Sequence, residues 1–177
     1  MTLEEFLALP EEKPYLEYVD GEACPKTMPT RRHGELVTEI LFRLRAYLES
    51  SPAGVARTEV RHYSERVNRA YLPDAEFTLR DNIRTGADQL DPVPEPPDLA
   101  IEVLSPDDRA SRVLDRVDFY LAEGVQIVWV VDPETETVTE YRPGARMRTL
   151  RRGEALEAEG VLPGFRLALA ELFDAAT

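Results

Sequence analysis

The chain has 177 residues, of which 43% are hydrophobic, and this length and composition are typical of one globular domain rather than of a disordered chain. Its formal net charge of −13 repels phosphates and disfavours nonspecific binding of nucleic acids. The single cysteine, Cys24, excludes an internal disulfide, which favours a reducing compartment. The sequence has neither a secretory signal nor an apolar stretch of about 20 residues. We therefore expect a cytoplasmic protein with no membrane partner, folded as one domain over residues 1–177.

The first part of the chain predicts a short helix, a pair of strands and a long helix. A helix over residues 2–9 precedes a strand at 15–19, which the Asp20-Gly21 turn connects to a short partner at 23–24. From residue 32 to residue 48 the apolar residues recur four apart, as they do on the buried face of an amphipathic helix. These residues are Leu36, Ile40, Leu44 and Leu48.

The second part of the chain predicts a sheet. Segments 98–105 and 125–131 are apolar on both faces, as central strands are, and a helix over 109–122 that ends at Gly124 connects them. This strand–helix–strand order predicts a parallel pair, and we expect an α/β fold with a mixed central β-sheet flanked by helices. The other expected elements are an antiparallel pair of strands at 55–63 and 69–79, a loop at 88–97, a hairpin at 136–142 and 145–151, and a short helix at 168–173.

Glu102 is the most informative residue of the sequence, because it interrupts a strand that we otherwise expect to be buried. An ionised carboxylate there is costly unless it is paired or bound to a metal ion. Asp74 follows Pro73 at the start of another strand, and two carboxylates on neighbouring strands offer hard oxygen ligands suited to magnesium or manganese. The alternatives are a buried ion pair or a strand-end glutamate for Glu102, and an ordinary turn for Asp74.

Four further residues are weaker candidates. Glu76 shares the strand face of Asp74 by alternation and is a reserve ligand. Glu17 alternates with apolar neighbours, so a solvent-facing strand position is its simplest interpretation. His33 opens the long helix, where it either contacts a phosphate or a metal ion or is exposed. His62 is expected on the surface.

The helix after Glu102 carries a stripe of arginines. Arg109, Arg112 and Arg116 are spaced so that they lie on one side of this helix. They form either a solvated face balanced by neighbouring aspartates or a row that binds a phosphate beside the metal ion.

Several of these residues belong to a longer pattern, which runs from residue 15 to about residue 141. Its most specific part is the segment 97–106 around Glu102, which is followed at a characteristic distance by Tyr120 and by the Trp-containing strand. The pattern also includes 15–22, His33 and 73–74. In these features the chain resembles the Uma-two family of predicted endonucleases, within the restriction-endonuclease-like PD-(D/E)XK superfamily.

The resemblance implies a restriction-endonuclease-like fold and metal-dependent hydrolysis of phosphodiester bonds, with DNA as the substrate. It implies that Asp74 and Glu102 bind Mg²⁺ or Mn²⁺ and that Glu17 is a further acidic residue of the catalytic site. A homodimer is also expected by resemblance alone. The family pattern has a lysine on the helix after the acidic strand and an aspartate four residues earlier. Arg116 and Arg112 occupy these two positions here.

Arg116 is expected to act as the catalytic cation, with Arg112 and His33 binding phosphate. An arginine is permanently charged and bidentate toward phosphate, so it stabilises negative charge, but it does not act as a base. Lys26, in the loop after the Glu17 strand, is an alternative source of a lysine. Because nothing in its spacing places it at the acidic residues, we expect it to lie elsewhere.

Two hypotheses of different kinds follow. The first is a magnesium-dependent endonuclease whose activity is weakened by Arg116, and the intact carboxylates favour it. The second is a catalytically inactive nuclease-fold protein that acts as a binding or regulatory module, which the acidic composition and the missing lysine favour. Salt bridges from Arg112 or Arg116 onto the carboxylates would support the second hypothesis.

Overall fold

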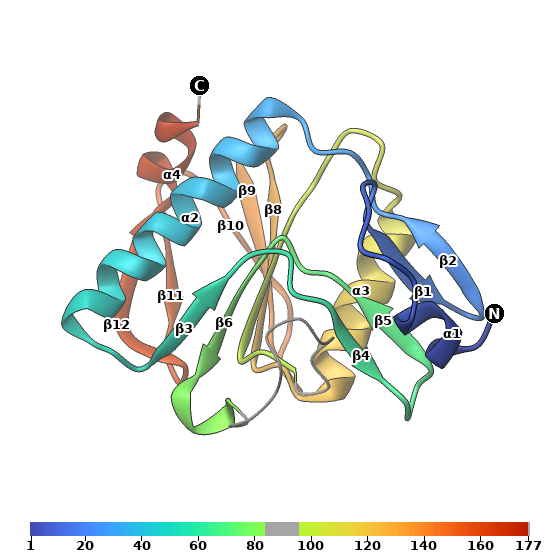
Figure 1. Cartoon of the computed structure of the whole chain (residues 1–177). Coiled ribbons are helices and arrows are strands. Elements are labelled where there is room, and N and C mark those ends of the chain that lie inside the picture. The colour runs from blue at the N-terminus through green and yellow to red at the C-terminus, as the bar shows by residue number, and fades with distance from the viewer. Residues whose placement is uncertain (84–95, 177) are drawn as a thin grey trace.

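The computed structural model describes residues 1–83 and 96–176, and its centre is a six-stranded sheet in the order β10-β9-β8-β7-β6-β3 (Figure 1). β7 and β8 are parallel and are connected through helix α3, whereas the other neighbours in this sheet are antiparallel. The predicted α/β fold with a mixed central sheet is therefore confirmed. The strands are β3 (Gly54–Arg57), β6 (Ala75–Leu79), β7 (Leu99–Val103), β8 (Ile127–Asp132), β9 (Thr137–Tyr141) and β10 (Arg148–Leu150).

A four-stranded sheet, in the order β2-β1-β5-β4, and a two-stranded sheet, β11-β12, accompany the central sheet. Within the described ranges, no helix is both long and apolar enough to cross a membrane. The strands of the smaller sheets are β1 (Leu16–Val19), β2 (Glu22–Pro25), β4 (His62–Ser64), β5 (Arg69–Tyr71), β11 (Ala155–Ala158) and β12 (Leu162–Ala168). The helices are α1 (Leu3–Leu7), α2 (Arg31–Ser50), α3 (Ala110–Glu123), α4 (Leu169–Ala175) and the 3₁₀ helix η1 (Arg80–Asn82).

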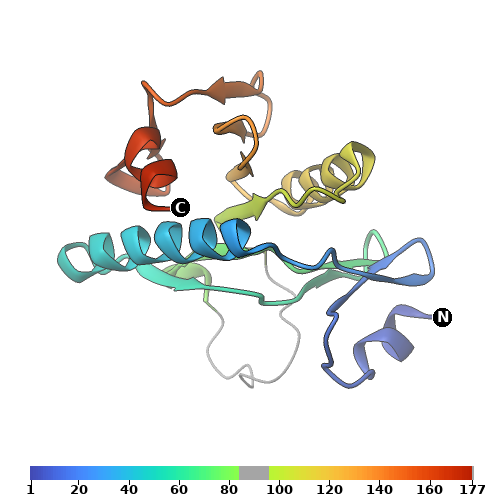
Figure 2. The ribbon, with the colours of Figure 1, turned by 90° about the horizontal axis from the view of Figure 1, so that it is seen from above.

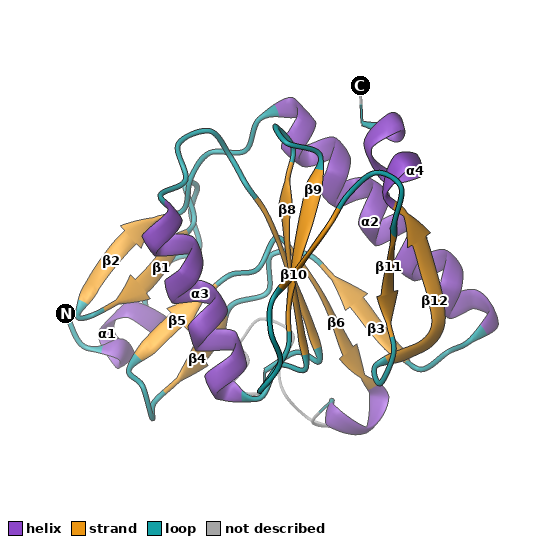
Figure 3. Ribbon diagram, turned by 180° about the vertical axis from the view of Figure 1, so that it is seen from behind, coloured by secondary structure: helices purple, strands orange, loops and turns teal. Residues whose placement is uncertain are grey.

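Helices α2 and α3 cover opposite faces of the central sheet, which Figures 1 and 3 show from the two sides. Side chains of a strand alternate between its faces, so β7 contributes Leu99, Ile101 and Val103 to the α2 side and Ala100 to the α3 side. Figure 2 shows α4 and the two-stranded sheet beside α2. Glu102 therefore belongs to the α3 face, where this helix packs through Val113, Val117 and Tyr120.

Helix α2 begins at Arg31, directly after the N-cap residue Thr30. The Thr30 side chain accepts a hydrogen bond from the backbone N–H of His33, which satisfies one of the unpaired amides of the first turn. The residues Leu36, Ile40 and Leu44 are fully buried, as their spacing predicts. This cap fixes the first turn of α2, and with it His33, at the edge of the central sheet.

The two strands expected at 55–63 and 69–79 are each divided in the structure. The first becomes β3 and β4 and the second becomes β5 and β6, with β3 paired to β6 and β4 to β5 in separate sheets. Glu59 adopts a positive φ of 53° between β3 and β4, and Pro73 cannot donate a ladder hydrogen bond between β5 and β6. The expected hairpin β9-β10 and the helix α4 are present, whereas the pair β11-β12 was not predicted. The expected loop at 88–97 lies mostly outside the described residues.

Replacing Gly54 with alanine is expected to destabilise the protein by about 1–3 kcal/mol. A Cβ atom at Gly54 would lie 2.1 Å from the Thr78 carbonyl oxygen and 2.7 Å from the Phe77 ring, so β3 and β6 would have to separate. Gly34 is the control, because a Cβ there meets nothing within 4 Å. Gly34→Ala in helix α2 is expected to stabilise by about 0.5–1 kcal/mol. Urea unfolding measures both values, and effects of the same sign would contradict the prediction.

Candidate functional site

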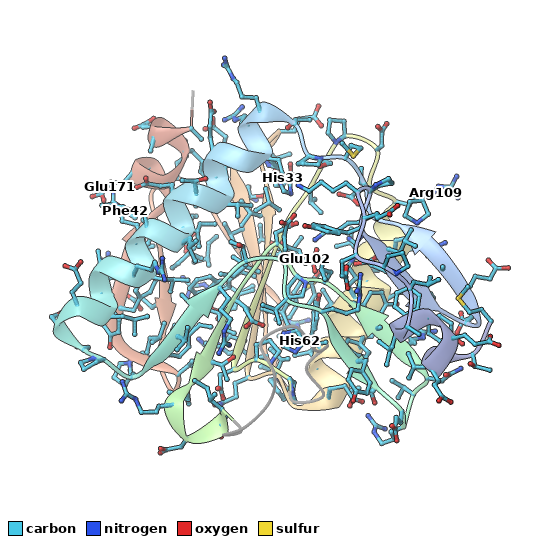
Figure 4. The ribbon with its side chains drawn as sticks, in the orientation of Figure 1. His33, Phe42, His62, Glu102, Arg109 and Glu171 are labelled. Carbon is cyan, nitrogen blue, oxygen red and sulfur yellow. The ribbon has the colours of Figure 1, made fainter. Side chains whose placement is uncertain are left out.

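Asp74 and Glu102 are brought together by the pairing of β6 with β7. The register pairs Ala75 with Ile101, and its continuation by one residue places Asp74 opposite Glu102, on the same face of the sheet. Both residues are buried, at 5% and 2% exposed. Figure 4 shows Glu102 near the middle of the molecule, between His33 and His62. The sequence therefore places two carboxylates side by side in a region from which water is largely excluded.

Both oxygens of Asp74 are occupied by donors. Its Oδ1 lies 2.7 Å from Nζ of Lys26, and its Oδ2 accepts a hydrogen bond from the backbone N–H of Val103 at 2.8 Å. Nε2 of His33 lies 3.1 Å from the same Oδ2. Burial alone would raise the pKa of Asp74, but the charge of Lys26 and the hydrogen bond from His33 outweigh it and hold this pKa well below its usual range. Asp74 is therefore ionised at neutral pH.

Glu102 has the opposite electrostatic character. The Tyr120 hydroxyl donates to its Oε1 at 2.7 Å, and Nη1 of Arg116 lies 3.6 Å from its Oε2. Burial raises the pKa of Glu102 to about 7, against the opposing charges of Lys26 and Arg116. Burial also raises the pKa of the Tyr120 hydroxyl, and the neighbouring Glu102 adds to that effect. The two neighbouring carboxyl groups thus have opposite pKa shifts, because burial dominates at Glu102 whereas Lys26 and His33 outweigh burial at Asp74.

Arg116 is buried and connects three carboxylates. Its Nε donates to both oxygens of Glu17 at 3.1 and 3.2 Å, and its Nη1 lies 3.6 Å from oxygens of both Glu102 and Asp108. Burial opposes its charge, but Glu102 and Glu17 outweigh burial and raise the pKa of Arg116. Glu17 lies on β1 and is 4% exposed, so its expected solvent-facing position is wrong. The structure brings Glu17, Glu102 and Arg116 into one network.

The expectation that Lys26 lies away from the acidic residues is also wrong. It lies in the loop after β2, and its ammonium contacts Asp74 and donates to the carbonyl of Leu72. Burial would lower its pKa, but the negative charges of Asp74, Glu102 and Glu17 outweigh burial and raise it. The spacing to Asp74 carries no signal because the contact joins two separate sheets. The signal that could have found it is composition, since Lys26 is one of two lysines in a chain rich in arginine.

The histidine and the exposed arginines also differ from expectation. His33 is buried at 8% exposed, and its Nδ1 has no hydrogen-bond partner among the described residues. Arg112 is exposed, and the pKa of its guanidinium is raised chiefly by Cys24 on β2. Arg109 is also exposed, and Figure 4 shows it far from Glu102. The expected row of arginines at the site is therefore reduced to Arg116.

Glu76 and His62 form a separate buried pair. Nε2 of His62 contacts one carboxylate oxygen of Glu76, and Nη1 of Arg57 lies 3.1 Å from the other. His62 is 3% exposed and Glu76 is fully buried, so the expectation that His62 lies on the surface is wrong. Glu76 shares a strand face with Asp74, as alternation predicts, but its carboxylate is engaged by these two partners. It is therefore a poor reserve ligand.

Asp74 and Glu102 are the two carboxylates that could hold a divalent cation in this site. In the described part of the chain, no group of three or more His, Cys, Asp or Glu side chains is arranged to hold a metal ion. Mg²⁺ is commonly bound by one or two carboxylates together with waters and substrate phosphates, so two hard oxygen donors suffice. The ammonium of Lys26 at Asp74 shows that the site stabilises a positive charge at this position.

Comparison with known proteins identifies a family and a solved structure that are similar to this chain. The family model Uma2, described as "Putative restriction endonuclease", matches residues 3–170. A crystal structure described as "a putative nuclease belonging to DUF820 from Anabaena variabilis ATCC 29413" superposes with a TM-score of 0.88 at 25% sequence identity, over 100% of this chain and 99% of that chain. No curated protein matches the sequence. Because the family model covers nearly the whole sequence, the chain belongs to the Uma2 family.

Proposed function

We propose that the protein is a metal-dependent nuclease that hydrolyses phosphodiester bonds of DNA. The observation that carries this proposal is the pair of buried carboxylates, Asp74 and Glu102, that β6 and β7 place side by side. Carboxylates are rarely buried without a partner or a metal ion, and perturbed carboxyl groups cluster at functional sites. The family description and the nuclease name of the structural relative support the same reaction class.

In this reaction the oxygen of a water molecule forms a bond to phosphorus, and the bond from phosphorus to the leaving oxygen breaks. The two protons of water are shared between the new phosphate end and the new hydroxyl end. Mg²⁺ or Mn²⁺ at Asp74 and Glu102 would lower the pKa of the water and polarise the phosphoryl oxygen. Glu102 accepts a hydrogen bond from Tyr120, which restrains the orientation of its carboxylate.

Arg116 and Glu17 form an ion pair beside Glu102. The single Nε–H of Arg116 is shared by both oxygens of Glu17, and Nη1 lies near Glu102. An arginine so engaged orients the acidic residues and offsets their mutual repulsion. Arg112, exposed on the same helix, is left to contact the DNA backbone outside the buried site.

Cleavage of a supercoiled plasmid tests the proposal, with Mg²⁺, with Mn²⁺ and with a chelator. The wild-type protein is expected to nick the plasmid only with a metal ion, and isothermal titration calorimetry is expected to detect binding of Mn²⁺. Asp74→Asn and Glu102→Gln keep the shape of each side chain and are expected to lose both binding and cleavage. Arg109→Gln is the control on an exposed residue. Wild-type cleavage that persists in the chelator would overturn the metal dependence.

A second candidate function is a binding or regulatory module without catalysis. The observation that favours it is the neutralisation of the site, because Lys26 pairs with Asp74, and Arg116 pairs with Glu17 and approaches Glu102. Ion pairs of this kind can close a former metal site. Absence of Mn²⁺ binding by the wild-type protein, together with absence of cleavage, would favour this candidate over the nuclease.

A further inference from the structure

The two lysines of the chain have opposite surroundings. Lys13 is exposed, and its ammonium lies over the ring of Tyr15 at 5.2 Å from the centroid. The Lys26 side chain is only 13% exposed, and its ammonium lies against Asp74. Burying an ammonium is costly unless several acceptors surround it. Lys26 lies within an acidic cluster that also holds Glu17 and Glu102, so we expect it to have a role other than solubility.

The backbone fixes Lys26 in this position before any ligand arrives. Its N–H donates to the carbonyl of Tyr15 at 2.7 Å, which extends the β1-β2 ladder by one residue. The next residue, Thr27, donates through its hydroxyl to Asp108 at 3.1 Å. The same segment reaches His33 seven positions later, so residues 26–33 supply a donor to each oxygen of Asp74. Both oxygens of Asp74 are therefore contacted by side chains of this one segment.

The two cations of the site contact different carboxylates. The Nε of Arg116 is shared by both oxygens of Glu17, and its Nη1 lies between Glu102 and Asp108. Among the described residues, Lys26 donates to two acceptors, Asp74 and the carbonyl of Leu72. An ammonium carries three N–H donors, so Lys26 retains one for an incoming oxygen. Its flexible stem also allows the ammonium to shift by a small distance.

We propose that Lys26 is the phosphate-facing cation of the site, and that its ammonium holds Asp74 until a metal ion takes that carboxylate. It then donates to a nonbridging oxygen of the scissile phosphate, where negative charge increases during attack by water. Arg116 is in this assignment a positioning residue that holds Glu17 and Glu102. The inference rests on the proposed nuclease function, and it moves the role of the lysine from helix α3 to the loop between β2 and α2.

Competition for Asp74 distinguishes this role from a structural salt bridge. The ammonium of Lys26 lies 2.7 Å from Oδ1 of Asp74, so it repels a metal ion that binds the same carboxylate. Removing the ammonium should therefore make metal binding tighter and cleavage slower. If Lys26 only supported the fold, its removal would not increase the affinity for the metal ion while it lowered the cleavage rate.

The test compares Lys26→Met, Lys26→Arg and Lys13→Met in the full chain. Methionine preserves an unbranched side chain without the charge, and Lys13→Met removes the other lysine outside the site. Titration calorimetry with Mn²⁺ is expected to give about tenfold tighter binding for Lys26→Met, the scale of a modest ion pair. The cleavage rate at saturating Mn²⁺ is expected to fall by about 10²–10³-fold, as when a donor to a transition-state oxyanion is removed. Lys26→Arg should retain part of the rate, and Lys13→Met should match wild type in both measurements.

Three results would overturn the assignment. Wild-type cleavage by Lys26→Met at saturating Mn²⁺ would make Lys26 a structural residue, with the nuclease function intact. Loss of Mn²⁺ binding by Lys26→Met would mean that the lysine supports the site rather than competing for it. Faster cleavage by Arg116→Lys, with no change in Lys26→Met, would return the role to helix α3. A wild-type protein that neither binds Mn²⁺ nor cleaves would instead contradict the proposed function itself.

Discussion

Replacing Arg116 with methionine is expected to destabilise the protein by about 3–5 kcal/mol at pH 8, because the change leaves buried carboxylates without their cation. Glu17 loses the Nε–H that its two oxygens share, and Glu102 and Asp108 lose the nearby Nη1. The side chains of these three acids are 2–8% exposed, so water cannot replace the arginine. Urea unfolding measures the loss, which corresponds to a decrease in Tm of about 10 °C in a domain of this size.

Arg112→Met is the matched control for this change. Arg112 lies one turn earlier on α3, is exposed, and its removal is expected to change stability by no more than about 0.5 kcal/mol. Arg116→Lys keeps the charge but not the forked geometry, so it should fall between the two. The destabilisation by Arg116→Met should also diminish toward pH 4, where the carboxylates left behind take up protons. Equal stability of Arg116→Met and Arg112→Met at pH 8 would show that Arg116 does not hold the cluster together.

The central sheet could be predicted because its sequence pattern is local. Continuous apolar runs around Glu102 and Trp129, with a helix between them, specify a parallel pair, and β7, α3 and β8 are found there. The placement of Asp74 opposite Glu102 follows from the same reasoning, since Pro73 marks the start of β6. The buried face of α2 could also be predicted from the spacing of its apolar residues, because Leu36, Ile40 and Leu44 share one side of this helix.

The cations of the site could not be predicted in the same way. Lys26 reaches Asp74 only because the β2-β1-β5-β4 sheet stands beside the central one, and nothing within a few residues of Lys26 encodes that arrangement. His62 is a similar case, since its burial depends on β4 separating from β3. The family pattern predicted the catalytic cation at the position of Arg116 on α3. The residue there is cationic, but it is paired with Glu17. Local periodicity predicts elements and faces, whereas contacts between sheets require the fold.

Glu102→Gln is expected to abolish a pH dependence of stability that the wild-type protein shows between about pH 4.5 and pH 7. The carboxyl group has a pKa of 4.5 when it is unperturbed, and burial raises it to about 7 in the folded protein. Between these values the folded protein retains a proton that the unfolded chain has released, so stability falls as pH rises through this window. The contribution is fully present below pH 4.5 and is lost above pH 7, with a total on the order of 3 kcal/mol.

Glutamine is neutral throughout, so the difference in unfolding free energy between wild type and Glu102→Gln should shift in favour of the variant from pH 4 to pH 8. Urea unfolding at intervals of one pH unit measures this difference, and groups common to both proteins cancel. Glu22→Gln, on an exposed residue of β2, is the control for removing a carboxylate elsewhere. Metal binding supplies an independent measurement, because a protonated Glu102 is a weak ligand and the affinity of the wild-type protein for Mn²⁺ should rise through pH 7. A stability difference that is constant with pH would mean that Glu102 is already ionised at pH 5, held so by Arg116 and Lys26, and the two carboxylates would then enter the reaction in the same protonation state.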